Sequence, residues 1–416
     1  ARAASTEPPV VVIGHGAEAV REYVGENGHC IVQDPQLGTG HAVMQAESCL
    51  RGKSDLVLVT YGDMPLMRPE TLVRLVEAQK ANAGPMTLLT VIAADPRGFG
   101  RIIRTTDGLV QAIVEEAAAT PEQLRINELN VGAYCFSADW LWDALHRIPL
   151  SKKGEYYLTE AVELAVRDHL SVRPIVSDDL DEAIGINTRI HLAEAAGAMF
   201  RRTNREHMLA GVTIVDPQAT YIEPGVTIGR DTVVWPNTFL RGRTAIGEAC
   251  VLGPDTLIDD SQVGDRCTIL KSVLEKALVE DDVDMGPFAH LRKGAHLCRG
   301  VHMGNFGEVK DSTLGPGTKM GHFSYIGNAT IGPDVNIGAG TITCNYDGVH
   351  KNPTEIGEGV FIGSDTMLVA PVKLGKRART GAGAVVTRDV PDDTLVVGGP
   401  ARPIKKMNEA KDGKPE

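Results

Sequence analysis

The sequence has 416 residues and is acidic, with 54 Asp and Glu against 42 Lys and Arg. Its length predicts two or more domains, and its charge argues against a broad nucleic-acid surface. No run approaches the roughly 18 apolar residues of a membrane-spanning helix, and the seven cysteines form no CxxC pair. These features predict a cytoplasmic protein with reduced thiols and without nucleic-acid or membrane partners.

Residues 1–187 alternate strand and helix patterns. Strands are predicted at 9–13, 55–60, 86–93 and 129–136, and helices at 39–50, 69–81, 137–147 and 158–169. A hairpin is predicted at 100–115, with its turn at Asp107-Gly108. This alternation predicts an α/β domain of Rossmann-like type, in which a mostly parallel sheet is covered on both faces.

Polar residues and glycines lie where a ligand of such a sheet would bind. Asp63 follows the buried run Leu56–Thr60, and a carboxylate at that edge can hold Mg²⁺ against a phosphate. The alternative is that Asp63 only caps a helix or satisfies its own loop. Gly38 and Gly40 lie in another strand-to-helix turn, where glycine lets backbone amides approach a ligand, although such turns are common without one.

The second half of the chain is repetitive. A helical pattern at 188–209 predicts a linker helix, which leads into residues 210–400 and then a polar tail at 401–416. From Ile222 to Leu374, with short slips, an aliphatic residue recurs every six positions. Neither a helix nor an alternating strand has that period. A hexapeptide repeat predicts a parallel β-helix, in which three hexapeptides close one coil around an aliphatic axis.

The coil geometry groups certain charged residues. Residues 18 positions apart should stack on one face, about 4.8 Å apart. Arg292 and Lys310 have this spacing, and each directly follows an inward aliphatic residue. Two stacked cations repel unless an anion lies between them, which predicts a phosphate site. The alternative is a solvated pair that Glu308 helps to neutralise.

Three histidines in the repeat need a different interpretation. His290, His296 and His302 recur every six residues, so each should lie on a different face of one coil. They cannot bind one ion together within a subunit. Zinc binding would require histidines gathered across a subunit boundary, which the sequence leaves open.

His322 is the candidate base. The repeat is interrupted between Ile337 and Ile356, so residues 343–351 must leave the coil as a loop. Interruptions of this kind often mark the binding face of a solenoid. A neutral imidazole suits proton abstraction at cellular pH, although a lone histidine is also commonly structural or merely exposed.

The motifs together resemble a known family over essentially the whole chain. The first half is similar to sugar-nucleotide pyrophosphorylases through Gln33–His41, Tyr61–Leu66, Gly98–Ile102, Ile113–Glu115, Glu128–Asn130, Gly154–Thr159 and Gly185–Asn187. With the solenoid, and above all Gly338–Gly348, the chain resembles the bacterial bifunctional N-acetylglucosamine-1-phosphate uridyltransferase/glucosamine-1-phosphate acetyltransferases. The resemblance implies a left-handed β-helix, a homotrimer with active sites between subunits, and a role in peptidoglycan and lipopolysaccharide precursor synthesis.

The resemblance also implies substrates and site residues. The uridyltransferase would use UTP, N-acetylglucosamine-1-phosphate and Mg²⁺, with the metal on Asp63 and Asn187. The other residues implied at the nucleotide and sugar are Gln33, Gly38, Thr39, Tyr61, Gly62, Gly100, Glu115 and Asn130. The acetyltransferase would use glucosamine-1-phosphate, acetyl-CoA as co-substrate and His322 as general base. Its sugar phosphate would bind Arg292, Lys310, Tyr325, Asn336, Asn345, Tyr346 and Lys351. The coenzyme would lie against Ala339, Asn345, Tyr346, Ser364 and Ala382.

Two departures from the family pattern lead to further expectations. These 416 residues do not include the family's glycine-rich triphosphate loop, so we expect a truncated first domain with impaired uridylyl transfer and a weak remnant metal pair. The segment Gly398–Ile404 follows a generic acyltransferase ending, and Arg402 is the candidate basic contact to coenzyme A. Two alternatives stay open. One is a sugar-1-phosphate nucleotidyltransferase with a purely structural or regulatory β-helix, and the other is a non-catalytic scaffold.

Overall fold

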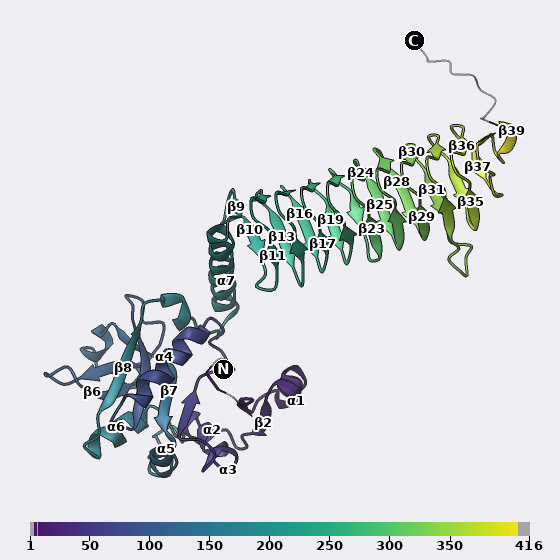
Figure 1. The fold of residues 1–416 in the computed structure, drawn as a ribbon. Coiled ribbons are helices and arrows are strands. Elements are labelled where there is room, and N and C mark those ends of the chain that lie inside the picture. Colours follow the sequence, from purple (N-terminus) through teal and green to yellow (C-terminus); the bar gives the residue numbers. More distant parts are fainter. Residues whose placement is uncertain (1–3, 6, 407–416) are drawn as a thin grey trace. The chain divides into compact units, whose positions relative to one another are not determined.

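The computed structural model describes residues 4–5 and 7–406. They form two compact units, Ala1–Ala198 and Met199–Glu416, and the boundary falls within the long helix α7 (Arg189–Leu209) (Figure 1). No helix in this described part of the chain combines the length and the apolar composition needed to cross a membrane.

The first unit contains the predicted alternation of strands and helices. Its strands are β1 (Val10–Ile13), β2 (His29–Val32), β3 (Leu56–Val59), β4 (Met86–Ile92), β5 (Arg101–Arg104), β6 (Val110–Val114), β7 (Glu128–Ser137) and β8 (Val172–Ser177). Its helices before α7 are α1 (Ala17–Val24), α2 (Thr39–Gln45), α3 (Glu47–Leu50), α4 (Pro69–Lys80), α5 (Ala138–Leu145) and α6 (Glu160–Arg167). Short 3₁₀ turns lie at Gly25–Asn27, Glu116–Ala118, Gln123–Arg125 and Leu180–Ala183.

These strands form two sheets. β1 and β2 make a separate parallel pair. The larger sheet has the order β6-β5-β7-β4-β8, and β3 also pairs with β7. Within it β4 and β8 are parallel, whereas β7 runs antiparallel to β3, β4 and β5, and β5–β6 is the predicted antiparallel hairpin.

Both faces of the larger sheet are covered, as predicted. Six of the seven residues of β4 are buried, so this central strand has no solvent face. Leu75 of α4 belongs to the hydrophobic cluster on one side, and Leu141 of α5 and Leu164 of α6 belong to the cluster on the other. The sequence patterns did not predict β2, β8 or α1. The reason is that β2 and β8 are only partly buried and α1 buries no residue.

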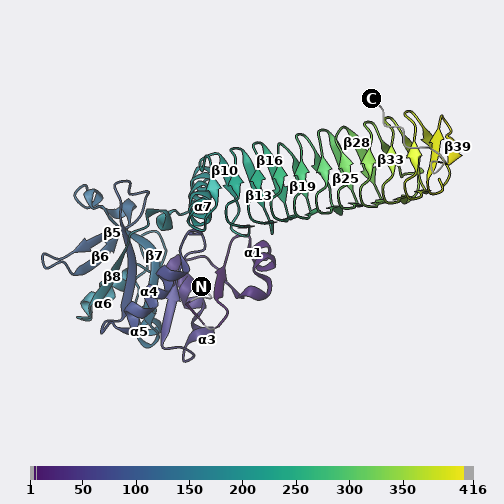
Figure 2. The same ribbon diagram turned by 45° about the horizontal axis from the view of Figure 1, so that its top comes forward.

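The second unit is the predicted β-helix (Figures 1 and 2). Apart from its last strand, it is built from parallel strands of two to four residues, which form three sheets. Sheet I has 10 strands, from β10 (Thr220–Ile222) to β37 (Val385–Val386). Sheet II has 9 strands, from β11 (Thr227–Ile228) to β35 (Val372–Leu374). Sheet III has 12 strands, from β9 (Thr213–Ile214) to β39 (Arg402–Lys406). We call the turns between successive sheets the I/II, II/III and III/I corners.

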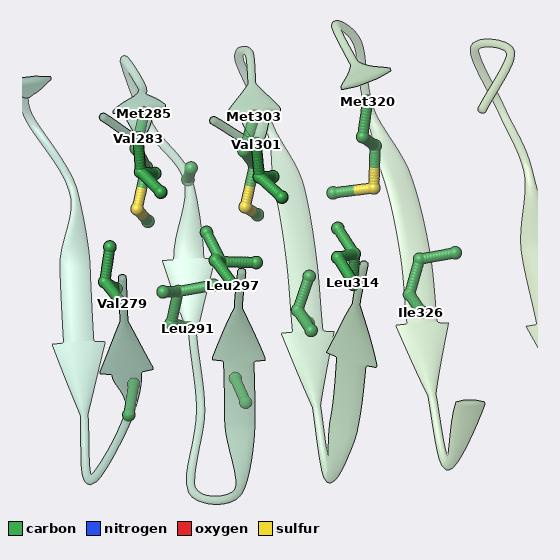
Figure 3. Close-up of a cluster of buried hydrophobic side chains, with 14 of the residues drawn as sticks. Val279, Val283, Met285, Leu291, Leu297, Val301, Met303, Leu314, Met320 and Ile326 are labelled. Atoms are coloured by element: carbon green, nitrogen blue, oxygen red, sulfur yellow. The ribbon is translucent and has the colours of Figure 1, made fainter. Parts of the chain in front are cut away.

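The aliphatic residues of the six-residue pattern fill the axis of the coils, as predicted. Figure 3 shows several of them pointing inward from successive strands. Leu291 pairs with Val309, and Val309 pairs with Ile326; all three side chains are fully buried. Each coil therefore buries its apolar surface against its neighbours, and the stability of the β-helix is built up coil by coil.

The end of the β-helix differs from the predicted polar tail. Residues Arg402–Lys406 form the exposed strand β39, which pairs antiparallel with β38 (Thr394–Val397). Arg402, Lys405 and Lys406 keep this edge polar, while the backbone gains hydrogen bonds to β38. The rest of the predicted tail, 407–416, lies outside the described residues.

Candidate active sites

Arg292 and Lys310 stack at the I/II corner, as the repeat predicted. Arg292 follows β22 (His290–Leu291), and its backbone amide donates to Val309 in β25 (Gly307–Lys310). Glu308 accepts a hydrogen bond from Nη1 of Arg292 at 3.0 Å. Glu308 thus pairs with Arg292, as the solvated-pair alternative anticipated, but the ion pairs of the described residues include none between Glu308 and Lys310.

The loop that interrupts the repeat adds a third cation at this corner. It leaves the coil after β31 (Ile342–Cys344), projects near β31 in Figure 1, and returns at β32 (Thr354–Ile356). The Lys351 ammonium lies next to that of Lys310 and, together with Arg292, lowers the pKa of Lys310. Like charges disfavour each other's protonated form, so the three cations carry unbalanced positive charge that a bound anion would relieve.

The loop has a defined shape. Tyr346 and Lys351 form an antiparallel bridge, and the Tyr346 hydroxyl donates to the carbonyl of Gly348 at 2.6 Å. The Asp347 carboxylate accepts from the amides of His350 at 2.7 Å and of the preceding residue at 2.8 Å. These backbone hydrogen bonds lower the pKa of Asp347. The turn therefore holds Lys351 in place on the coil side of the loop.

Uncharged hydrogen-bonding groups lie beside the three cations. Tyr325, in β28 (Ser324–Gly327), and Asn345 converge over Gly327. A Cβ at Gly327 would lie 2.4 Å from the Tyr325 hydroxyl and 2.8 Å from the Asn345 amide nitrogen, so this position has no room for a side chain. Asn345 is buried and donates to the Asn328 side-chain oxygen at 2.7 Å. A hydroxyl and a fixed amide next to cations can bind a phosphorylated sugar.

His322 lies at the opposite end of β28, on the III/I corner. It is exposed, and the described residues offer it no hydrogen-bond partner. The next residue, Phe323, is 56% exposed, and its carbonyl accepts from the amide of Gly340 one coil further on. The imidazole is therefore free to meet a ligand from solvent.

The residues implied at the coenzyme form a line along the same corner. The carbonyl of Ala339 accepts from the amide of Asp365 at 2.6 Å, and the carbonyl of Ser364 accepts from the amide of Gly383 at 2.8 Å. Ala339, Ser364 and Ala382 therefore occupy successive coils on the corner that carries His322. Small side chains there leave the backbone open to an extended ligand.

Two implied residues lie apart from the cations. Asn336 belongs to β30 (Asn336–Ile337) in sheet III, where it pairs with Lys319 and Phe361. His322 and Lys310 are separated by the length of β28, since Lys310 pairs with Gly327 at its far end. Three residue steps of strand span about 10 Å. One coil of one chain thus presents two half-sites on two different corners.

In the first unit, Asp63 and Asn187 come together from distant parts of the chain. The carbonyl of Asp63 accepts from the amide of Ile186 at 2.9 Å, and a Cβ on Gly185 would lie 4.0 Å from the Asp63 carboxylate. Both Asp63 and Asn187 are exposed. Carboxylate and amide oxygens are hard ligands that suit Mg²⁺, which keeps several waters in such sites. These two residues fit the implied metal.

The segment that the family resemblance places at the uracil is held in position by hydrogen bonds. Gln33 donates to the carbonyl of Gly38 at 3.0 Å, and Gly38 has φ +95°. A Cβ at Gly38 would lie 2.8 Å from the carbonyl oxygen of Tyr156, so only glycine fits. The Thr39 hydroxyl accepts from the amide of Leu158 at 3.0 Å. The turn is therefore held against the segment that precedes α6.

The residues that the family resemblance places at the sugar belong to one network of contacts. Gly100 accepts through its carbonyl from the amide of Asn130 at 2.9 Å, and a Cβ on Gly100 would lie 3.7 Å from the Glu115 carboxylate. The side-chain amide of Asn130 donates to the Tyr134 hydroxyl at 2.7 Å. Burial raises the pKa of Tyr61, which packs edge-on against Tyr134. Gly62 follows Tyr61 in an exposed turn.

Sequence reasoning missed several members of these sites. Tyr134 is fully buried between Asn130 and Tyr61, and Thr159 donates to Glu115 at 3.1 Å. A tyrosine inside a buried strand was an available indication, since a buried hydroxyl needs a partner. Asn328 gave no such indication, because its partner Asn345 comes from the loop.

Comparison with known proteins identifies the family of this chain. Residues 1–180 match the nucleotidyl transferase family, and residues 353–388 match the bacterial transferase hexapeptide family of six repeats. "Bifunctional protein GlmU" of Syntrophomonas wolfei is 46% identical over 396 residues, which cover 95% of this chain and 88% of the relative. The chain belongs to the bifunctional GlmU family. GlmU of Trichlorobacter lovleyi is 45% identical over 401 residues, 95% of this chain and 87% of that protein. GlmU of Enterococcus faecalis is 44% identical over 409 residues, 98% and 89% of the two chains. The predicted fold class and family are thereby confirmed.

Proposed function

We propose that the β-helix transfers the acetyl group of acetyl-CoA to the amine of glucosamine-1-phosphate and so forms N-acetylglucosamine-1-phosphate. The observation that carries this proposal is the convergence of Arg292, Lys310 and Lys351 beside Tyr325 and Asn345. A phosphate monoester satisfies three clustered cations better than a single carboxylate does, because it offers more charge and more acceptor oxygens. The neighbouring hydroxyl and amide suit the sugar.

The reaction needs a base and a path for the leaving group. In the proposed step His322 takes a proton from the sugar amine, whose nitrogen forms a bond to the thioester carbonyl carbon. The carbon–sulfur bond then breaks, and the coenzyme A thiolate leaves and takes up a proton. Acetyl-CoA would extend along the III/I corner past Ala339, Ser364 and Ala382, whose small side chains leave room for it.

A complete site requires a second copy of the chain, and we propose a homotrimer. In glucosamine-1-phosphate the amine and the phosphorus are four bonds apart, at most about 5 Å. Strand β28 separates His322 from the cations by about twice that distance. The exposed rings of Phe288 and Phe306 stack at 5.3 Å, and both lie on the corner that carries Phe323 and His322. Such an apolar line suits contact with another subunit, which would bring its I/II corner to His322.

We further propose that the first unit, when it is joined to the family's glycine-rich triphosphate loop, transfers uridylyl from UTP to N-acetylglucosamine-1-phosphate, releasing pyrophosphate. Asp63 and Asn187 would hold Mg²⁺, whose charge would stabilise the phosphates. Gln33, Gly38 and Thr39 would bind the uracil, and Gly100, Glu115 and Asn130 would bind the sugar. The product of the β-helix is the substrate of this unit. Free cysteines suit the cytoplasm, where both co-substrates are made.

Thiol release from acetyl-CoA in the presence of glucosamine-1-phosphate tests the acetyltransferase proposal. His322→Ala should lower the rate about 10²–10⁴-fold, the usual contribution of a positioned base. His302→Ala is the matched control, since His302 is a half-exposed histidine of the same β-helix and pairs with Asp284 at 2.9 Å. No thiol release by the wild type would instead favour a nucleotidyltransferase with a structural β-helix. A rate within about threefold of wild type for His322→Ala would remove His322 from the mechanism.

A separate test addresses the uridyltransferase. Asp63→Asn should lower Mg²⁺-dependent pyrophosphate release from UTP while leaving thiol release unchanged, because the two sites lie in different units. The substitution keeps the size of the side chain and removes its charge. Equal loss of both activities would indicate a folding defect and contradict the assignment of Asp63 to the metal.

A further inference from the structure

Three side chains with different metal-binding atoms meet at the II/III corner, whereas the proposed acetyltransferase half-sites lie at the I/II and III/I corners. The His296 Nε2 lies 2.8 Å from Glu280 Oε1 and 3.8 Å from Cys298 Sγ. All three ligand atoms lie within 4.8 Å of one another, and all three residues are half-buried. No other group of three histidine, cysteine or acidic side chains in the described part of the chain meets this condition.

The repeat explains why these residues converge. His296 and Cys298 flank Leu297 in and after β23 (Ala295–Leu297), and Leu297 points to the axis. Because side chains alternate along a strand, His296 and Cys298 both point outward. Val279 pairs with Leu297, which places Glu280 one coil below Cys298. The sequence His-Leu-Cys with a glutamate one coil earlier therefore builds a three-residue face.

The glutamate is held in position independently of the histidine. Its second oxygen, Oε2, accepts from the backbone amide of Arg299 at 2.9 Å. The hydrogen bond from His296 lowers the pKa of Glu280, so the carboxylate is charged. Burial and the charge of Glu280 raise the pKa of the Cys298 thiol.

The other histidines of the same coil provide an internal comparison. His290 pairs with Glu275 at 3.0 Å on sheet I, and His302 pairs with Asp284 at 2.9 Å on sheet III. The three histidines lie on three different sheets, as the six-residue spacing predicted. The carboxylate partner is common to all of them. Of these three histidines, only His296 has a cysteine thiol within reach among the described residues.

We propose that Glu280, His296 and Cys298 bind one divalent metal ion of the zinc type, with water as the fourth ligand. In a tetrahedral zinc site the nitrogen and oxygen ligands are about 3.3 Å apart, and nitrogen and sulfur about 3.6 Å apart. The observed 2.8 Å and 3.8 Å require shifts of about half an ångström or less, within the reach of half-exposed side chains. Binding would replace the His296–Glu280 hydrogen bond and release the thiol proton.

Cobalt is a direct probe, because Co²⁺–thiolate complexes absorb strongly in the near ultraviolet. The full chain, freed of metal by a chelator, should bind one Co²⁺ with a thiolate band that Zn²⁺ displaces. Cys298→Ala should abolish the band. Cys344→Ala removes another half-buried cysteine, and His302→Ala removes a histidine paired with a carboxylate but without a thiol. Both variants should retain the band.

Two further measurements keep the proposal falsifiable if Cys298→Ala is unstable. Glu280→Gln keeps the side-chain shape and should weaken Co²⁺ binding more than about tenfold, the smallest cost usual even for outer-shell changes. Zn²⁺ should also raise the Tm of the wild type, since a ligand of the native state stabilises it. No band in the wild type, or a band retained in Cys298→Ala, would overturn the proposal. Undiminished binding by Glu280→Gln would exclude the carboxylate as a ligand.

Discussion

Mixed trimers offer the sharpest test of the proposed site, because its two halves lie on different corners of one chain. His322→Ala removes the base and leaves the cations, whereas Lys310→Ala weakens the phosphate site and leaves the base. Neither variant alone should be efficient at low concentrations of glucosamine-1-phosphate. If each site combines His322 of one chain with Lys310 of the next, a trimer that contains both variants will hold some intact sites.

The expected recovery follows from this geometry. In a cyclic trimer each site draws one half from each of two neighbouring chains. With equal amounts of the two variants and random assembly, the base comes from the Lys310→Ala chain in half of the sites. The cations come independently from the His322→Ala chain in half of the sites. About one quarter of all sites should therefore be intact in the unselected mixture. A trimer that contains both variants holds one intact site in three, so the activity of purified mixed trimers should approach about one third of the wild-type value.

Co-expression of the two variants, followed by purification through a tag on each, provides the sample. Thiol release is then measured with glucosamine-1-phosphate well below its KM, where the Lys310→Ala defect is fully expressed. Co-expressed His322→Ala and His322→Asn chains serve as the control, since both lack the same half and should show no recovery. Activity no greater than the average of the separate variants would show that base and cations act within one chain.

Other consequences are measurable on single variants. Lys310→Ala should raise the KM for glucosamine-1-phosphate about 10–100-fold with little change for acetyl-CoA, whereas Lys373→Ala, which removes an equal charge elsewhere on the β-helix, should change neither. The backbone hydrogen bond from His350 lowers the pKa of Asp347, so this carboxylate fully stabilises the loop above the ordinary carboxyl pKa, and the stabilisation is lost as the pH falls through the lowered pKa. Asp347→Ala should therefore raise the KM for the sugar phosphate and flatten the acid side of the pH profile of activity. An unchanged acid side would contradict the role of the turn. Leu291→Ala should lower the free energy of unfolding by about 2–5 kcal/mol, because this side chain is fully buried on the axis. Chemical denaturation measures this loss, and a smaller loss would show that the coils collapse around the cavity.

Much of the β-helix was predictable because its structure is local and periodic. The six-residue spacing predicts aliphatic residues on the axis, and the 18-residue spacing of Arg292 and Lys310 predicts that they stack on one another. Three histidines on three faces followed from the same period. In each case the partner of a residue lies a fixed number of positions away, so the sequence by itself determines which side chains meet.

Tertiary structure decided the contacts that break this periodicity. Lys351 reaches Lys310 only because the loop folds back on itself, and a loop has no register that its sequence reveals. In the first unit, the antiparallel pairing of β3 with β7 sets Val59 opposite Tyr134 and so brings Tyr61, which is far away in the chain, against the Tyr134 ring. Parallel and antiparallel strands have similar apolar patterns when both faces are buried, so pairing depends on the packing of the whole sheet. Fold and repeat positions were therefore set by the sequence, whereas the third cation and the tyrosine network were set by long-range packing.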